Sequence, residues 1–299
     1  TAVASTVAFR TGVFNLGIES QVIVGGIAGT WVGFAFELPA IIHFPLVFLV
    51  AFLAGAFWAA LPALMRQKLG ISEIITTIMT NYIGTFLVSY LLQYVLPVSK
   101  RLAETPFVHD TAKLPQFMEL KPGLAMATRA HVGIFVALAI AAVVYVVLQR
   151  TKLGFEWRMV GLSIPFAEFT GMNTAKTFIG GFLASGGLAG MAGLIEAIGV
   201  WRRFKAGIGL NFGFKGNLAA LLGGQTVIGS TIAGIFYGAM EAGALGVEWS
   251  TGVPRQLIDI LVGLIIFFMA APGLWDILKR IKWVSAPGIV ERTTDEVEA

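Results

Sequence analysis

Two long, nearly uncharged apolar stretches limit most strongly what this chain can fold into. Residues 41–64 read IIHFPLVFLVAFLAGAFWAALPAL, and residues 131–148 read HVGIFVALAIAAVVYVVL. A helix needs about 20 mostly apolar residues to cross the hydrocarbon core of a bilayer. Only 13% of the 299 residues are charged, against about 25% in a typical soluble domain. The sequence therefore predicts an all-α polytopic membrane protein.

Other apolar segments predict further helices within a single transmembrane domain over 1–299. We expect the end of a helix at 1–9, complete spans at 18–36, 74–96, 177–200, 226–246 and 255–272, and a half-length segment at 213–224. The total is about eight or nine full or half transmembrane helices, and the 36 glycines favour close packing between them. The first residue is not Met, so we expect that one or more N-terminal helices are missing.

The positions of Lys and Arg predict the orientation, because short cytoplasmic loops carry an excess of these residues. Basic residues cluster at 66–68, 150–158 and 279–282. This pattern predicts a cytoplasmic loop at 151–176, a cytoplasmic tail at 276–299 and an external loop at 97–130. The basic stretch WRRFK at 201–205 falls outside on this scheme. Segment 213–224 is then a re-entrant half-helix, or another boundary is wrong.

Several classes of function are disfavoured by what the sequence lacks. There is no cysteine, and the three histidines, His43, His109 and His131, are far apart, which argues against disulfides, thiolate catalysis and a Cys- or His-rich metal site. No G-x-x-x-x-G-K-[ST] phosphate loop is present. The net charge of +4 fits membrane topology better than a nucleic-acid surface. We expect no enzyme activity, metal or cofactor on this chain.

Residues 151–176 differ from the rest because they are amphipathic rather than uniformly apolar. Pro165 suits the first turn of a short helix over 166–172. Phe166, Phe169 and Met172 would share one face of that helix, and Gly171 lies near its end. Such a face must be covered, either by the membrane surface or by a cytoplasmic partner protein.

Polar residues near or within the apolar segments are the other candidates. Asn15, Glu19 and Gln21 lie at the start of segment 18–36, and Thr77 and Asn81 near the start of 74–96. Polar groups are costly in a membrane, so they bond between helices or line a water-filled path. Both interpretations remain open. Phe14 and Asn15 are the preferred pathway pair, since an aromatic side chain can stack on a base or another ring of a solute and an amide can bond to a base edge.

Six motifs in order resemble one family. They are FNLGIESQ (14–21), ISEIITTIMTNYI (71–83), LGFEWRMVGLSIPFAEFTGMN (153–173), FGFKGNLAALLGG (212–224), IFYGAMEAGA (235–244) and TGVPRQLIDILVGLIIFF (251–268). Together they resemble permease subunits of ABC importers for branched-chain amino acids, simple sugars and nucleosides, and within that family the nucleoside-type permeases. Ser20 replaces a usual Gly and Lys215 a common Asp, which leaves the substrate open.

The resemblance implies a type II ABC importer fold in a bacterial inner membrane and a set of partners. These are ATPase subunits that bind the ATP, a second permease subunit, which we expect to be non-identical, and an external substrate-binding protein. The loop around 163–174 would be the coupling helix, with Pro165, Phe166, Phe169, Gly171 and Met172 at the contact and Glu156 and Arg158 beside it. Phe14, Asn15, Glu19, Gln21, Thr77 and Asn81 would line the substrate path.

The main alternative is an ion-coupled secondary transporter. It would use carboxylates such as Glu19 and Glu241 and helices broken at glycines. The half-length segment 213–224 is compatible with that function. The ordered motifs and the amphipathic loop favour the permease.

Overall fold

The computed structural model describes residues 1–96, 103–117, 130–251, 256–257, 260 and 263–264, which are helical apart from connecting segments and two isolated β-bridges. Contacts divide the chain into two units, 1–239 and 240–299. The predicted span 255–272 lies largely outside the described residues, and the predicted tail 276–299 lies wholly outside them.

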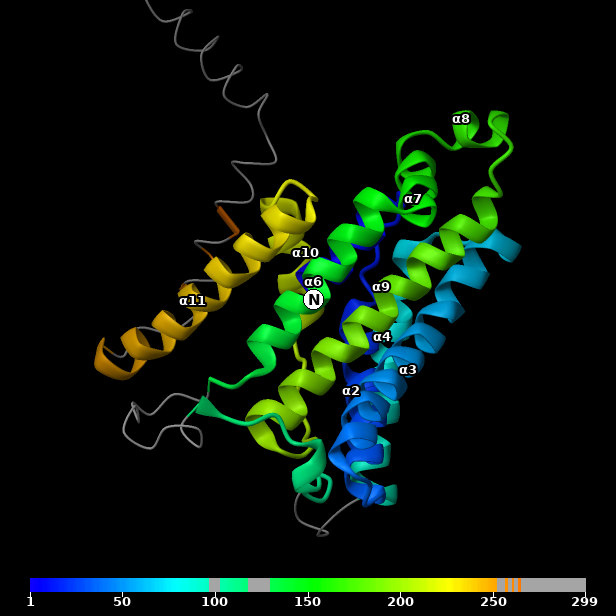
Figure 1. Ribbon diagram of the computed structural model, residues 1–299. Helices are drawn as coiled ribbons and strands as arrows, with labels where there is room; N and C mark the ends of the chain where they lie inside the picture. Colours follow the sequence, from blue (N-terminus) through cyan, green and yellow to red (C-terminus); the bar gives the residue numbers. More distant parts are fainter. Residues whose placement is uncertain (97–102, 118–129, 252–255, 258–259, 261–262, 265–299) are drawn as a thin grey trace, which may run out of the picture. The chain divides into compact units, whose positions relative to one another are not determined.

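The helices of Figure 1 follow the predicted segments closely. Their bounds are α1 Ala2–Arg10, α2 Ile18–Ala35, α3 Ala40–Leu69, α4 Glu73–Tyr90, α6 Gly133–Arg150, α7 Lys152–Leu162, α8 Ile164–Phe169, α9 Thr174–Glu196, α10 Phe212–Leu222 and α11 Val227–Thr251. Short π-helical turns extend α4 over Leu91–Val95 (η1) and α9 over Ala197–Trp201 (η4), and a 3-10 turn, η2, covers Asp110–Ala112.

Five helices of the described part are long and apolar enough to cross a membrane. They are Ala40–Leu69, Glu73–Val95, Gly133–Arg150, Thr174–Trp201 and Val227–Glu248. The prediction of a polytopic, all-helical membrane protein is confirmed. α2 occupies the segment predicted at 18–36 but is not among the five. The predicted half-length segment is the 11-residue helix α10.

Glycines hold α2, α3 and α9 at close approach in the core of the first unit. A Cβ on Gly25 of α2 would lie 2.2 Å from the Cα of Gly190 in α9. A Cβ on Gly55 of α3 would lie 2.3 Å from the carbonyl oxygen of Gly186 in α9. Small residues allow membrane helices to pack backbone against backbone. These three helices therefore form the central, tightly packed layer against which α1, α4 and α10 lie.

The predicted external loop is structured where it is described. Val108, Ala112 and Leu114 are buried in the same apolar cluster as α2, α3 and α9 residues. The backbone N–H of Thr105 donates to the carbonyl of Phe204, at 2.8 Å. Residues 103–117 thus pack beside 198–206, at the C-terminal end of α9, whereas α8 precedes the N-terminal end of that helix (Figure 1).

This packing accounts for the basic stretch 201–205, which did not fit the charge pattern. A side-chain nitrogen of Arg203 lies 2.6 Å from Oε1 of Glu104, and both side chains are largely buried. The Arg203 guanidinium also lies 4.5 Å from the ring centre of Phe107. Arg203 therefore accompanies the 103–117 segment, where Glu104 matches its charge.

Candidate functional site

A buried polar cluster lies where the irregular segment between α1 and α2 meets α9 and α10. We call it the polar junction and define it as Asn15, Gln21, Ser185 and Asn217. The Asn15 amide donates to Oε1 of Gln21 at 2.9 Å and to the Ser185 hydroxyl at 3.1 Å. The Asn217 amide donates to the Asn15 carbonyl at 3.1 Å. Because buried polar groups need partners, these bonds tie four segments of the chain together.

Two predicted pathway residues of α4 also face the start of α2. The Asn81 amide donates to the Leu16 carbonyl at 2.8 Å, and its oxygen accepts the Ser20 backbone N–H at 3.1 Å. Thr77 is fully buried, and its hydroxyl donates back to the carbonyl of Glu73 in its own helix. Asn81 therefore links α4 to the N-terminus of α2.

Phe14 and Glu19, the other two predicted pathway residues, lie outside the polar junction. Phe14 is 37% exposed, and its ring centre lies 5.3 Å from that of Phe9. Glu19 is half-buried in the first turn of α2. A Cβ on Gly213 would lie 2.4 Å from the Glu19 backbone nitrogen, so α10 and α2 approach closely here.

Asn217 is the polar-junction residue that the sequence analysis missed. Its Nδ2 bonds to Asn15, but its buried Oδ1 has no hydrogen-bond partner among the described residues. The signal was available, since Asn217 is the one amide side chain inside the half-length segment 213–224. A buried acceptor without a donor is uncommon. The Asn217 oxygen can therefore accept a further hydrogen bond at this end of the polar junction.

The predicted coupling segment forms a short helix whose aromatic side chains point away from the protein. Ser163 caps α8, because its hydroxyl oxygen accepts the Phe166 N–H at 3.4 Å. Phe166 is 54% exposed and Phe169 is 91% exposed. Ala167 is completely buried and anchors the opposite side of the helix. Two large aromatic side chains thus remain available for contact.

The predicted extent of this helix is wrong at both ends. It begins at Ile164 rather than at 166 and ends at Phe169, so Met172 does not share its face. Gly171 has a φ of +80°, a left-handed conformation that turns the chain out of the helix. The half-buried Met172 lies after this turn, and Pro165, as predicted, occupies the first helical turn.

The sequence analysis did not separate helix α7 from α8, and α7 connects the predicted coupling segment to the helices packed against it. Trp157 is buried in an apolar cluster with residues of α1, α6 and α11. A Cβ on Gly161 would lie 2.3 Å from the Arg10 carbonyl oxygen. Glu156 lies 3.9 Å from Lys152, and Arg158 donates to Gln149 at 3.1 Å. Glu156 therefore has its partner within α7, and Arg158 has its partner at the C-terminal end of α6.

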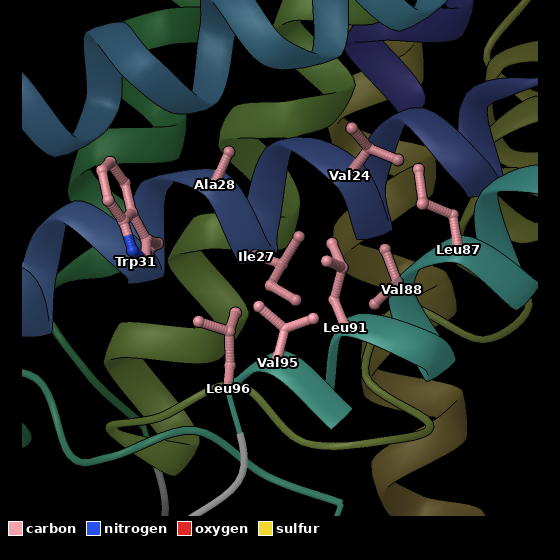
Figure 2. Close-up of a pocket in the computed structure, with 9 residues that line it drawn as sticks. All are labelled: Val24, Ile27, Ala28, Trp31, Leu87, Val88, Leu91, Val95 and Leu96. Carbon is pink, nitrogen blue, oxygen red and sulfur yellow. The ribbon is translucent and has the colours of Figure 1, made fainter. Parts of the chain in front are cut away.

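An apolar groove runs between α2 and the C-terminal half of α4 (Figure 2), with a cavity volume of about 350 Å³. Its lining is formed by Val24, Ile27, Ala28, Trp31, Leu87, Val88, Leu91, Val95 and Leu96. Trp31 carries the one side-chain heteroatom of this lining (Figure 2). In the described part of the chain, no three His, Cys, Asp or Glu residues are grouped as they would be to hold a metal ion.

Comparison with known proteins agrees with this architecture. The family model of the branched-chain amino acid transport system permease component matches residues 1–270. The guanosine ABC transporter permease protein NupP of Bacillus subtilis is 36% identical over 88% of this chain and 75% of its own length. The nucleoside ABC transporter permease protein NupB of Lactococcus lactis is 29% identical over 93% and 77%.

A sugar transporter subunit is similar to the same degree. The glucose ABC transporter permease protein TsgB13 of Haloferax volcanii is 36% identical over 87% of this chain and 70% of its own. No solved structure matches the chain. The family match covers most of the sequence, and the helices are those of a multi-pass membrane protein. The chain therefore belongs to the family of branched-chain amino acid transport system permeases.

Proposed function

We propose that this chain is a membrane-spanning permease subunit of an ATP-binding cassette importer in the bacterial inner membrane. It would move a small polar solute, a nucleoside first and a simple sugar second, by alternating access that a partner ATPase drives. Its other partners would be a non-identical second permease subunit and an external substrate-binding protein. Family membership supports the transport role. The exposed aromatic face of α8 is the observation that supports coupling to the ATPase.

The case for coupling rests on the placement of α8. Phe166 and Phe169 are exposed, whereas α7 directly before them is anchored through Trp157 and Gly161 to the helices of the first unit. A push on α8 would therefore reach α1, α6 and α9 through packed contacts. Aromatic side chains are frequent anchors at protein interfaces. We take Phe169 to fill a cleft of the ATPase, with Phe166 beside it.

The proposal of a nucleoside as the transported solute rests on the substrates for which similar proteins are named. One relative is named for guanosine and another for nucleosides, whereas one of equal identity is named for glucose. The polar junction supplies amide and hydroxyl groups that could bond a base edge or a sugar hydroxyl once the path opens. In the present structure Asn15 and Gln21 are fully buried and bonded to one another. The pathway role of these residues therefore requires a conformational change.

The ion-coupled alternative has weaker support. It needs a buried carboxylate that binds the coupling ion. Glu19, its first candidate, is half-buried beside α10. Glu241, its second, is half-buried in the second unit. Neither the family nor the named relatives favour it.

The coupling test replaces Phe169 in the assembled transporter. Phe169→Asp places a charge in the proposed ATPase cleft, and Phe169→Leu keeps an apolar side chain there as the matched control. We expect Phe169→Asp to abolish solute uptake and substrate-stimulated ATP hydrolysis, and Phe169→Leu to retain most of both. Wild-type uptake by Phe169→Asp would refute the docking role of α8.

A further inference from the structure

One candidate span differs from the others in the chemistry of its exposed face. Every exposed residue of α3 from Ile41 to Leu64 is apolar. The exposed residues of α6 from Ile134 to Val146 are apolar except Tyr145, and those of α11 up to Ala239 are all apolar. α9 exposes no side chain between Thr177 and Val200. Faces of this kind suit a lipid or packed environment.

The exposed face of α4 is different. Tyr82, Thr85, Ser89 and Gln93 are all exposed. Tyr82, Thr85 and Ser89 of α4 are spaced at i, i+3 and i+7, which places them on one side of the helix, and Gln93 follows in its π-helical extension η1. We call this set the polar stripe of α4. Phe86, 70% exposed, lies within it, and Tyr90 lies at its edge.

Two of the stripe residues, Tyr82 and Thr85, lie too far from the ends of the span to be placed at the membrane–water interface. At a rise of about 1.5 Å per residue, Tyr82 lies roughly 14 Å and Thr85 roughly 18 Å from the start of this span of roughly 35 Å. Tyrosines near the ends of spans, such as Tyr94, belong to the usual aromatic belt. Tyr82 and Thr85 lie near the middle, where lipid offers no hydrogen bond.

Three of the four stripe side chains also lack a hydrogen-bond partner within the described residues. Ser89 bonds back to the Thr85 carbonyl at 2.7 Å. The side chains of Tyr82, Thr85 and Gln93 make no hydrogen bond within the described residues. The residues predicted from sequence on this helix, Thr77 and Asn81, satisfy their groups inside the protein instead. The polar stripe is therefore the surface of α4 that needs an outside partner.

We propose that the polar stripe of α4 lines the water-filled path of the transporter and contacts the solute in transit. The solute class is neutral, hydroxyl-bearing and ring-containing, as a nucleoside is. The exposed residues of α4 between Ile74 and Val95 include hydroxyls, an amide and aromatic rings but no charge. Rings can stack on a base, and single neutral hydrogen bonds are weak enough to let a solute leave. This inference rests on the proposed transport function.

None of these 299 residues is a cysteine, so a thiol introduced among them is compared with the unsubstituted transporter as background. Thr85→Cys and Ser89→Cys place single thiols on the stripe, and Leu53→Cys places one on the apolar exposed face of α3 as a control. The complete transporter in membrane vesicles is treated with a negatively charged, membrane-impermeant methanethiosulfonate reagent. We expect thiols at 85 and 89 to react at least tenfold faster than the thiol at 53. Saturating guanosine should slow their reaction severalfold.

Three outcomes separate the possibilities. Reaction at 85 and 89 as slow as at 53 would overturn the proposal, since lipid or a dry contact with the second permease would then cover the stripe. Fast reaction that no transported solute slows would also overturn it. If wild-type vesicles take up no guanosine, the proposed nucleoside function fails, and protection is measured with the solute that the binding protein retains. Protection by that solute would still support the stripe. Ser89→Cys, the mildest change, carries the test if Thr85→Cys does not fold.

Discussion

The close approach of α3 and α9 predicts a large difference between two glycine-to-alanine changes in one helix. In Gly190→Ala the new Cβ would lie 2.3 Å from the carbonyl oxygen of Ala51 and 3.1 Å from the Cα of Gly25. In Gly180→Ala the nearest atom would be Nε1 of Trp157, at an ordinary 3.6 Å. Both changes gain the same helix propensity, so their difference isolates the clash between helices.

The size of the effect follows from this geometry. An ordinary contact begins near 3.4 Å, so the backbone of α3 must move by about 1.1 Å (3.4 minus 2.3) to accept the Gly190→Ala methyl group. Overpacking of this kind costs about 1–3 kcal/mol, whereas Ala gains up to about 1 kcal/mol over Gly in a helix. Gly180→Ala should therefore be neutral or stabilising, and Gly190→Ala destabilising relative to it.

The assay compares thermal unfolding of the two variants in the same detergent. At about 2–4 °C per kcal/mol for a chain of this size, the Tm of Gly190→Ala should lie roughly 2–12 °C below that of Gly180→Ala. Folded protein remaining after heating, measured by size-exclusion chromatography, gives the Tm of each. Equal Tm values would refute the view that direct backbone contact between α3 and α9 holds this core together.

Two further predictions concern polar groups. Asn15→Ala leaves Gln21 and Ser185 without their buried partner, so it should lower the free energy of unfolding by about 1–3 kcal/mol. Glu19→Ala is the control and should change this free energy little. An equal loss in both variants would contradict the assigned hydrogen bonds. Burial lowers the pKa of His131 from its usual 6.5, and its neutral Nδ1 accepts the Gly133 N–H. His131 has a higher pKa in the unfolded chain, so the unfolded chain takes up a proton at a higher pH than the folded protein does. The free energy of unfolding should therefore fall as the pH drops below about 6.5. His131→Asn, which keeps an acceptor for the N–H, should flatten this fall in a Tm-against-pH series, and an unchanged slope would refute the assignment.

The spans could be predicted from the sequence because their length and lack of charge leave few alternatives. The bounds of α2 and α6 are close to the predicted ones. α3 continues through Pro45 and Pro62 to Leu69, five residues past the predicted end, and Gly70 ends it in a left-handed conformation. The charge pattern could not place 201–205, because the Glu104 partner of Arg203 lies 99 residues away in the chain.

The candidate sites were harder to predict, because an apolar helix gives little sign of which face is buried. Polarity in α4 directed attention to Thr77 and Asn81, which bond within the protein. The exposed hydroxyls of Tyr82 and Thr85 could be recognised only once the neighbours of α4 were known. The end of α8 depended on Gly171, whose left-handed turn removes Met172 from the helical face.

The energy source of transport tests the central claim most directly. Vesicles that contain this chain and the proposed second permease, binding protein and ATPase are loaded with ATP. Guanosine uptake is measured with wild-type ATPase, with a hydrolysis-deficient ATPase, and with ionophores that collapse the proton and sodium gradients. We predict uptake that disappears with the deficient ATPase and persists with the ionophores. Uptake that survives loss of ATP hydrolysis but stops when a gradient collapses would contradict the assignment and indicate an ion-coupled transporter.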